Sequence, residues 1–231
     1  MSYRVQLLSV IGLFASLSLT GCGSSNSSGT VQLRLMNASP QQPNLNMLID
    51  NSSFQSSIPY PSASAYASEA AGTHTVQLEA VDSTTALTTQ SITLSSGADY
   101  TVLAVESTTA STALTMSLLN DNNTAPSSGN VEVRIINASP DFGNADVYIS
   151  APGVGTSSGT GPSVGNLAFP AASSYQTLVA GAYEIYFTVA GQQDIAVDSG
   201  PLSLTGGQIQ TLVLVGDATT GYTSTLVSDL N

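Results

Sequence analysis

Two arginines occupy the same ten-residue motif, 100 residues apart. Residues 31–40 read VQLRLMNASP and residues 131–140 read VEVRIINASP, so Arg34 is matched by Arg134. A guanidinium fork binds carboxylates and phosphates bidentately, which would suit an anionic ligand. The alternative is structural, with each arginine paired to an acid of its own domain at the strand end. We expect the structural role.

The residues after each arginine support a structural interpretation. Asn and Ser hold turns through bonds from side chain to backbone, and Pro fixes the exit of the chain. The motif supplies these residues twice, as Asn37, Ser39 and Pro40 and as Asn137, Ser139 and Pro140.

Other residues with chemical potential are few. His74 is the sole histidine and is replaced by Tyr183 in the second copy, so we interpret it as an exposed turn residue rather than part of a Ser-His-Asp triad. With one His and one Cys, a zinc site is excluded. Asn120–Asn123 carries oxygen ligands suited to Ca²⁺ but lacks the spacing of an EF-hand, which favours a linker.

Together these observations predict no catalytic residues, no metal and no cofactor, and so a protein that is not an enzyme. The sequence pattern distinguishes no two of the 15 acids as a catalytic pair. An enzyme or accessory subunit that uses carboxylates, with or without calcium, remains the alternative.

The charge balance limits the partners. The chain has no Lys, three Arg and 15 acids, for a net charge of −12. Phosphate neutralisation needs clustered cations, so nucleic acid is excluded as a partner. Bare anionic membrane surfaces should also repel this chain.

The first residues resemble a bacterial lipoprotein signal. Arg4 precedes an apolar run, Val5–Leu19, which is shorter than the roughly 20 residues of a membrane span. Leu19-Thr20-Gly21-Cys22 is similar to the lipobox, in which cleavage precedes a cysteine that becomes acylated. We predict a signal peptide over 1–21, lipid attachment at Cys22 and a flexible tether over 22–30. In lipoproteins an Asp after this cysteine favours the inner membrane, and Gly23 here favours the outer membrane of the cell envelope.

The repeat extends beyond the arginine motif. Tyr66 aligns with Tyr175 and Gly72 with Gly181, at an offset of 109 that indicates an insertion over 151–163 in the second copy. We therefore predict one domain over 31–119, a linker over 120–130 and a second domain over 131–231.

Apolar residues alternate with polar ones in both copies, which predicts strands. Val31, Leu33 and Leu35 alternate with Gln32, Arg34 and Met36, and several later runs have the same period of two. About seven short strands per copy, separated by turn residues, indicate an all-β fold of two tandem immunoglobulin-like β-sandwich domains.

The motif V-x-V-R-x-x-N-A-S-P, followed by Asp146-Val147-Tyr148-Ile149, resembles the bacterial domain-of-unknown-function family 4397. The first copy departs from it, with Asn46 in place of the Asp. The resemblance implies tandem extracytoplasmic β domains and no activity. We expect a lipid-anchored envelope protein that binds a protein or glycan partner or acts as a spacer.

Overall fold

The computed structural model describes residues 29–108, 114–156, 159 and 161–229. The expected signal peptide, Cys22 and most of the tether lie outside these residues. Within them the protein is all-β and contains no helix. Nothing in the described ranges is a helix long and apolar enough to cross a membrane.

Each repeat contributes nine strands to the described structure. In repeat 1 they are β1 (Thr30–Asn37), β2 (Asn44–Ile49), β3 (Ser52–Pro59), β4 (Ser62–Ala63), β5 (Ala67–Ala70), β6 (Gly72–Ala80), β7 (Ala86–Leu94), β8 (Asp99–Glu106) and β9 (Leu114–Asp121). In repeat 2 they are β10 (Asn130–Asn137), β11 (Ala145–Ser150), β12 (Val164–Leu167), β13 (Ala171–Ala172), β14 (Gln176–Val179), β15 (Gly181–Val189), β16 (Val197–Leu204), β17 (Ile209–Asp217) and β18 (Gly221–Ser228).

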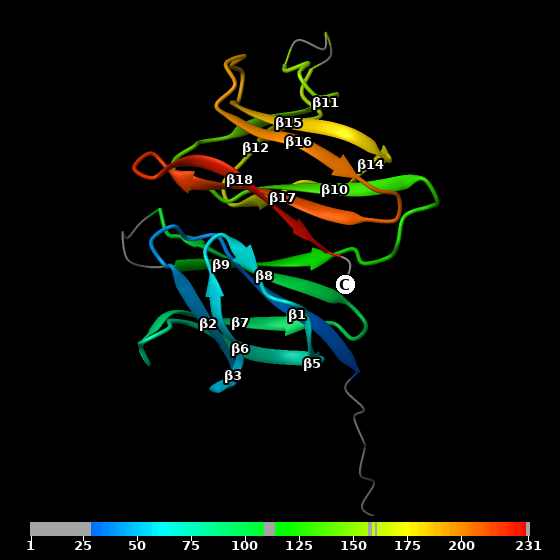
Figure 1. Ribbon diagram of the computed structural model, residues 1–231. Coiled ribbons are helices and arrows are strands. Elements are labelled where there is room, and N and C mark those ends of the chain that lie inside the picture. Colours follow the sequence, from blue (N-terminus) through cyan, green and yellow to red (C-terminus); the bar gives the residue numbers. More distant parts are fainter. Residues whose placement is uncertain (1–28, 109–113, 157–158, 160, 230–231) are drawn as a thin grey trace, which may run out of the picture.

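The strands form two sandwiches of the same topology, which confirms the predicted fold class (Figure 1). In repeat 1 the sheet β4-β1-β8-β9, with β5 also on β1, faces the sheet β3-β2-β6-β7. Repeat 2 has β13-β10-β17-β18, with β14 on β10, and β12-β11-β15-β16. The first strand of each repeat runs parallel to its eighth, as β1 with β8 and β10 with β17.

Each sandwich has its own apolar core. Val31, Leu33 and Leu35 of β1 belong to the first core, and Val131, Val133 and Ile135 of β10 belong to the second. Both triplets are the alternating residues that predicted strands. The predicted insertion, 151–163, falls in the connection between β11 and β12.

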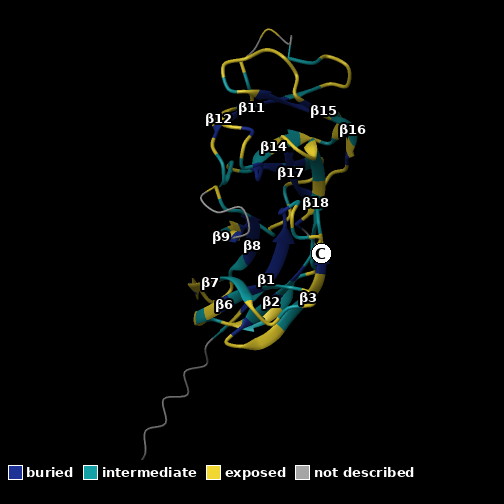
Figure 2. Ribbon diagram, turned by 90° about the vertical axis from the view of Figure 1, so that its left-hand side faces the viewer, coloured by how far each residue is buried: buried dark blue, intermediate teal, exposed yellow. Residues whose placement is uncertain are grey.

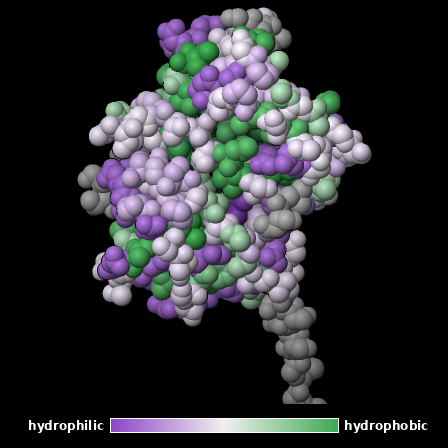
Figure 3. Space-filling model, in the orientation of Figure 1, coloured by the Kyte–Doolittle hydropathy of each residue, from purple (hydrophilic) through white to green (hydrophobic). Residues whose placement is uncertain are grey.

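The two sandwiches stack so that one sheet of each faces the other repeat (Figure 1). We call β4-β1-β8-β9 and β13-β10-β17-β18 the inner sheets, and the other two the outer sheets. The central strands of the inner sheets, β1, β8, β10 and β17, are deeply buried (Figure 2), and all nine residues of β17 are buried. Elsewhere the surface is mainly hydrophilic, with an apolar area on repeat 2 around β16, β17 and β18 (Figure 3).

Candidate functional site: the buried network between the repeats

The outward face of β1 is covered by the other repeat. Leu33 and Leu35 point into the core of repeat 1, so Arg34 and Met36 point the opposite way, as a strand requires. Alternation places these two residues on the strand face that points away from the core, yet Arg34 is only 3% exposed and Met36 only 2%. A period of two locates the faces of a strand, but it does not reveal that both faces are buried.

An apolar layer joins the two inner sheets. Its buried members come in pairs of equivalent residues, one from each repeat: Met36 and Ile136, Ala38 and Ala138, Leu103 and Val213, Val105 and Val215. At roughly 25 cal/mol for each Å² of apolar surface removed from water, such a layer favours the closed arrangement.

Arg34 lies beside this layer and crosses to the other repeat. Its Nη2 forms an ion pair with Oδ1 of Asp229 at 2.5 Å, and its Nη1 donates to the Ser228 carbonyl at 2.7 Å. Nε donates to Oγ1 of Thr101 on β8 at 2.8 Å. The guanidinium therefore links β1 and β8 of repeat 1 to the end of β18 in repeat 2.

Arg134 makes the equivalent crossing in the other direction. Its Nη2 lies 2.7 Å from Oδ1 of Asp121, and its Nη1 donates to the Asn120 carbonyl at 3.3 Å. Nε donates to Oγ1 of Thr211 at 3.1 Å, and Asp229 lies 3.5 Å from Nη2. Burial lowers the pKa of Arg134, but the charges of Asp121 and Asp229 outweigh it and raise that pKa, so the group stays ionised.

The expectation that each arginine pairs with an acid of its own domain is therefore wrong in its main part. The closest carboxylate to each guanidinium belongs to the other repeat. The sequence did hold a signal, because Asp121 and Asp229 follow matching segments, SLLND at 117–121 and TLVSD at 225–229. Asp121, expected in a linker, closes β9 and is 7% exposed.

Two tyrosines complete the network. The Arg34 guanidinium carbon lies 4.5 Å from the ring centre of Tyr66, and that of Arg134 lies 4.8 Å from the ring centre of Tyr175. Each hydroxyl donates to a buried acid, Tyr66 to Asp121 and Tyr175 to Asp229, both at 2.7 Å. Burial raises the pKa of both tyrosines far above the ordinary value, so the phenols remain protonated donors.

The residues after each arginine hold the chain as the motif suggested. Asn137 donates its amide hydrogens to the carbonyls of Gly143 and Leu167 at 2.8 and 3.0 Å. Its oxygen accepts the Ser139 backbone N–H at 3.2 Å. Pro140 then begins the turn.

Asn37 makes the equivalent set of bonds in repeat 1, to the carbonyls of Gln42 and Ile58 and from the N–H of Ser39. Pro40 begins its turn. The two serines differ, because Ser39 donates to Glu106 and Ser139 donates to the Gly216 carbonyl.

The difference between Asp146 and Asn46 has a local explanation. Asp146 accepts the backbone N–H groups of Asn166 and Gly191, at 2.7 and 2.8 Å. Asn46 accepts the N–H of Ser57 at 2.8 Å. Ser57 and Asn166 both have φ near 55°. Either side chain therefore holds the same irregular point in the third strand of its repeat, and the Asp is not a lost ligand in repeat 1.

His74 lies on β6, and both of its ring nitrogens have hydrogen-bond partners. Nδ1 is 2.8 Å from Oδ2 of Asp50, and Nε2 is 3.0 Å from the Ala70 carbonyl. The Asp50 hydrogen bond raises the pKa of His74, while the Thr75 N–H and then His74 lower the pKa of Asp50. Both contacts are with acceptor oxygens, so the protonated ring can donate to each of them. Tyr183 occupies the equivalent position in repeat 2, and its hydroxyl donates to the Val179 carbonyl.

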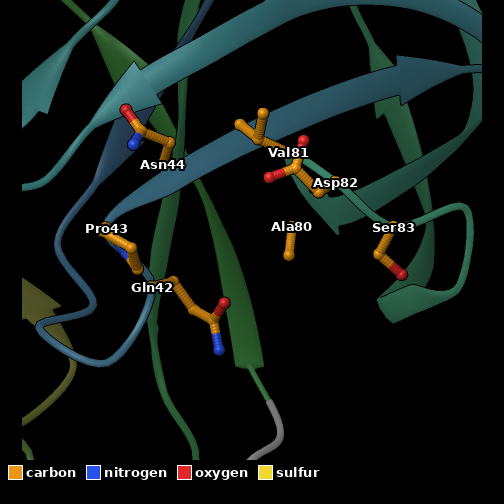
Figure 4. A pocket seen from close by; sticks show the side chains of 7 residues that line it. All are labelled: Gln42, Pro43, Asn44, Ala80, Val81, Asp82 and Ser83. Atoms are coloured by element: carbon orange, nitrogen blue, oxygen red, sulfur yellow. The ribbon is translucent and has the colours of Figure 1, made fainter.

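A hollow of about 330 Å³ lies at the loops of repeat 1, lined by Gln42, Pro43, Asn44, Ala80, Val81, Asp82 and Ser83 (Figure 4). Asp82 is its one charged group, so it offers no pair of groups for acid–base chemistry. The described residues contain no group of three or more His, Cys, Asp and Glu side chains that could hold a metal ion.

Comparisons with known proteins identify a family, and several solved structures align with the chain at low similarity. The family model "Domain of unknown function (DUF4397)" matches residues 31–148. No curated protein matches the chain.

Three solved structures are similar over most of the chain. The Bacillus anthracis TIE protein has 13% identity and a TM-score of 0.25, over 82% of this chain and 34% of that one, so this chain spans about a third of its length. The family 26 carbohydrate-binding module of Eubacterium rectale Amy13K, in complex with maltoheptaose, has 10% identity and a TM-score of 0.26, over 85% and 95%. Family 41 modules from streptococcal virulence factors, described as recognising α-glucan, have 10% identity and a TM-score of 0.26, over 84% and 95%.

Proposed function

Since this chain belongs to the DUF4397 family, whose function is unknown, we propose its role from the geometry of its two repeats. It is a lipid-anchored, non-enzymatic module of the bacterial cell envelope, attached to the outer membrane through Cys22. Its two repeats act as one rigid arm, which holds the far loops of repeat 2 away from the membrane for a protein partner.

The observation that carries this proposal is that both arginines form ion pairs between the two repeats of the described structure. They are 3% and 2% exposed and pair with carboxylates across the repeats. A guanidinium that is buried in such an ion pair cannot also bind an anionic ligand. Opening the interface would also return the apolar layer to water, which opposes hinge motion between the repeats.

The loops at the far end of repeat 2 are the best candidates for the contact surface. They lie at the top of Figure 1, whereas β1 starts at the lower end. Three aliphatic side chains are exposed there, Val154, Val189 and Ile195, at 44, 44 and 46%. Surface apolar groups gathered on one site favour protein–protein contact.

The insertion loop between β11 and β12 is bonded to the neighbouring strand β15 and to the β15–β16 loop. Gly153 N–H donates to Glu184 of β15, and Thr156 donates to the Gln193 carbonyl of the β15–β16 loop. The first loop belongs to the insertion that repeat 1 lacks. In the described ranges no aromatic side chain is exposed, so stacking on a sugar ring has no platform there. This favours a protein over a glycan.

A photo-reactive amino acid at Val154 or Ile195 tests the contact surface. In intact cells we expect cross-linking to one envelope protein. Asn51 is the matched control, because it is exposed at the β2–β3 turn that corresponds to the insertion. Equal cross-linking from Asn51 would contradict the proposed surface, and a cross-linked glycan would replace the protein partner.

Replacing Cys22 by Ser tests the anchor. Each acyl chain adds about 0.8 kcal/mol per buried methylene, so two chains hold a protein stably on a membrane. We expect the native protein in the membrane fraction with an acylated Cys22 by mass spectrometry, and the variant in the soluble fraction. An unmodified Cys22 in protein from the native host would refute the anchor.

A further inference from the structure

The face between the repeats is built like that of a symmetric dimer. In an isologous interface the same patch appears on both sides, so residue i contacts j and j contacts i. Equivalent residues supply the apolar layer here, as with Met36 and Ile136, or Val105 and Val215. The two halves also have the same strand order, with β1 beside β8 and β10 beside β17.

The charges follow the same rule. Arg34 of repeat 1 pairs with Asp229 of repeat 2, while Arg134 of repeat 2 pairs with Asp121 of repeat 1. Tyr66 and Tyr175 each stack on their own repeat's arginine and donate to their own repeat's acid. Each repeat thus carries one guanidinium and one carboxylate that fit the same pair on another repeat.

The connection between the repeats does not fix which chain supplies the partner. Residues 122–129 join β9 to β10, and their side-chain bonds are short-range, as from Asn122 to Glu132. A linker this short gives the tethered repeat an effective concentration in the millimolar range, which favours pairing within one chain when chains are dilute. The contacts themselves are the same for a repeat of a second chain.

We propose that this face is a homotypic recognition surface, through which repeat 1 of one chain also pairs with repeat 2 of a second copy. The product is an exchanged dimer with two interfaces, each identical to the one within the single chain. This inference depends on neither the lipid anchor nor the partner of the far loops.

Two complementary variants of the full chain test the exchange. Arg34→Glu places a carboxylate opposite Asp229, and Asp229→Arg places a guanidinium opposite Arg34, so each variant alone has like charges across its interface. In an exchanged dimer of one copy of each, the two altered repeats meet and form an ion pair. The two native repeats also meet, with the native pair. The matched control carries both substitutions in one chain, which restores the pair internally.

We expect the two variants, refolded together in equal amounts, to give a species of twice the chain mass by light scattering. Its melting temperature should match that of the doubly substituted chain, which should be a monomer. If the mixture behaves as the sum of the two separate variants, the proposal is overturned. The equivalent pair Arg134→Glu and Asp121→Arg gives a second test by the same criteria, should the first control chain fail to fold.

The native chain supplies a measurement that needs no variant. Chains with two different affinity tags are refolded together at about 1 mM, where a second chain competes with the tethered repeat. We expect doubly tagged dimers to account for about a tenth of the protein or more. Doubly tagged material at background level would overturn the proposal.

Discussion

Replacing Arg134 by Met should weaken both repeats, because Arg134 holds them together. Methionine keeps much of the aliphatic bulk of the arginine stem but removes the guanidinium. That change removes the partner 2.7 Å from Oδ1 of Asp121 and the donor to the Asn120 carbonyl. Asp121 is 7% exposed and would remain buried without a countercharge.

The expected loss in the free energy of unfolding depends on the hydrogen bonds that Asp121 keeps in the variant. Breaking a buried ion pair by removing one partner costs about 3–5 kcal/mol. The hydroxyls of Tyr66 and Thr101 still donate to Asp121, at 2.7 and 2.6 Å, so we expect the lower end, about 3 kcal/mol. For a folded unit of this size, each kcal/mol moves the melting temperature by roughly 2–4 °C, which gives a decrease of about 6–12 °C.

Calorimetry measures the decrease, and hydrogen exchange shows where it acts. Amide protection should fall in β8 and β9 of repeat 1 as well as in β10 and β17 of repeat 2. Glu132→Gln is the control, because Glu132 lies on the same face of β10 but is partly exposed and should change stability by less than about 0.5 kcal/mol. Lost protection confined to repeat 2, or an unchanged melting temperature, would refute the role of Arg134 across the interface.

Three further outcomes are expected. The Asp50 hydrogen bond should give His74 an NMR titration midpoint above the ordinary value, and Asp50→Asn should lower it. Because the pKa of His74 is raised on folding, its contribution to stability is complete below about pH 6.5 and is lost as pH rises through the raised pKa; a melting temperature that rises there would contradict this. Gly216→Ala should lower the melting temperature by several degrees, since φ is +94° and an added Cβ would lie 2.0 Å from a backbone oxygen, whereas Gly207→Ala has φ +90° but no atom within 4 Å and should lower it less. Asn137→Ala should cost about 3 kcal/mol in chemical denaturation, because the carbonyls of Gly143 and Leu167 lose their donor and the buried Ser139 N–H loses its acceptor; a cost below 1 kcal/mol would mean that water replaces the amide.

The sequence predicts the core of each sandwich well, because alternation reports directly on the face that turns inward. Leu33 and Leu35, with Val133 and Ile135, all lie where the period of two requires. The last strands, β9 and β18, carry a weaker pattern and were not predicted. Their burial is uneven, since β18 alternates only between exposed and half-buried residues.

The partners of the arginines could not be predicted, since a repeat in one dimension does not give the contacts between its copies. Comparing the ends of the two copies reveals Asp121 and Asp229 as equivalent acids. It does not show that each pairs with the other copy's arginine, because that depends on how the inner sheets face each other. The turn residues were easier, since Asn37 and Asn137 each bond to backbone groups within a few residues of the motif, although each also reaches a strand of the facing sheet.

The ion pair between Arg34 and Asp229 joins positions 195 residues apart in the chain. Arg34 is synthesised long before Asp229, so repeat 1 is made with its apolar, charged inner face uncovered until repeat 2 follows. On the homotypic pairing proposed above, repeat 2 of a neighbouring copy can cover that face before the chain's own repeat 2 is complete.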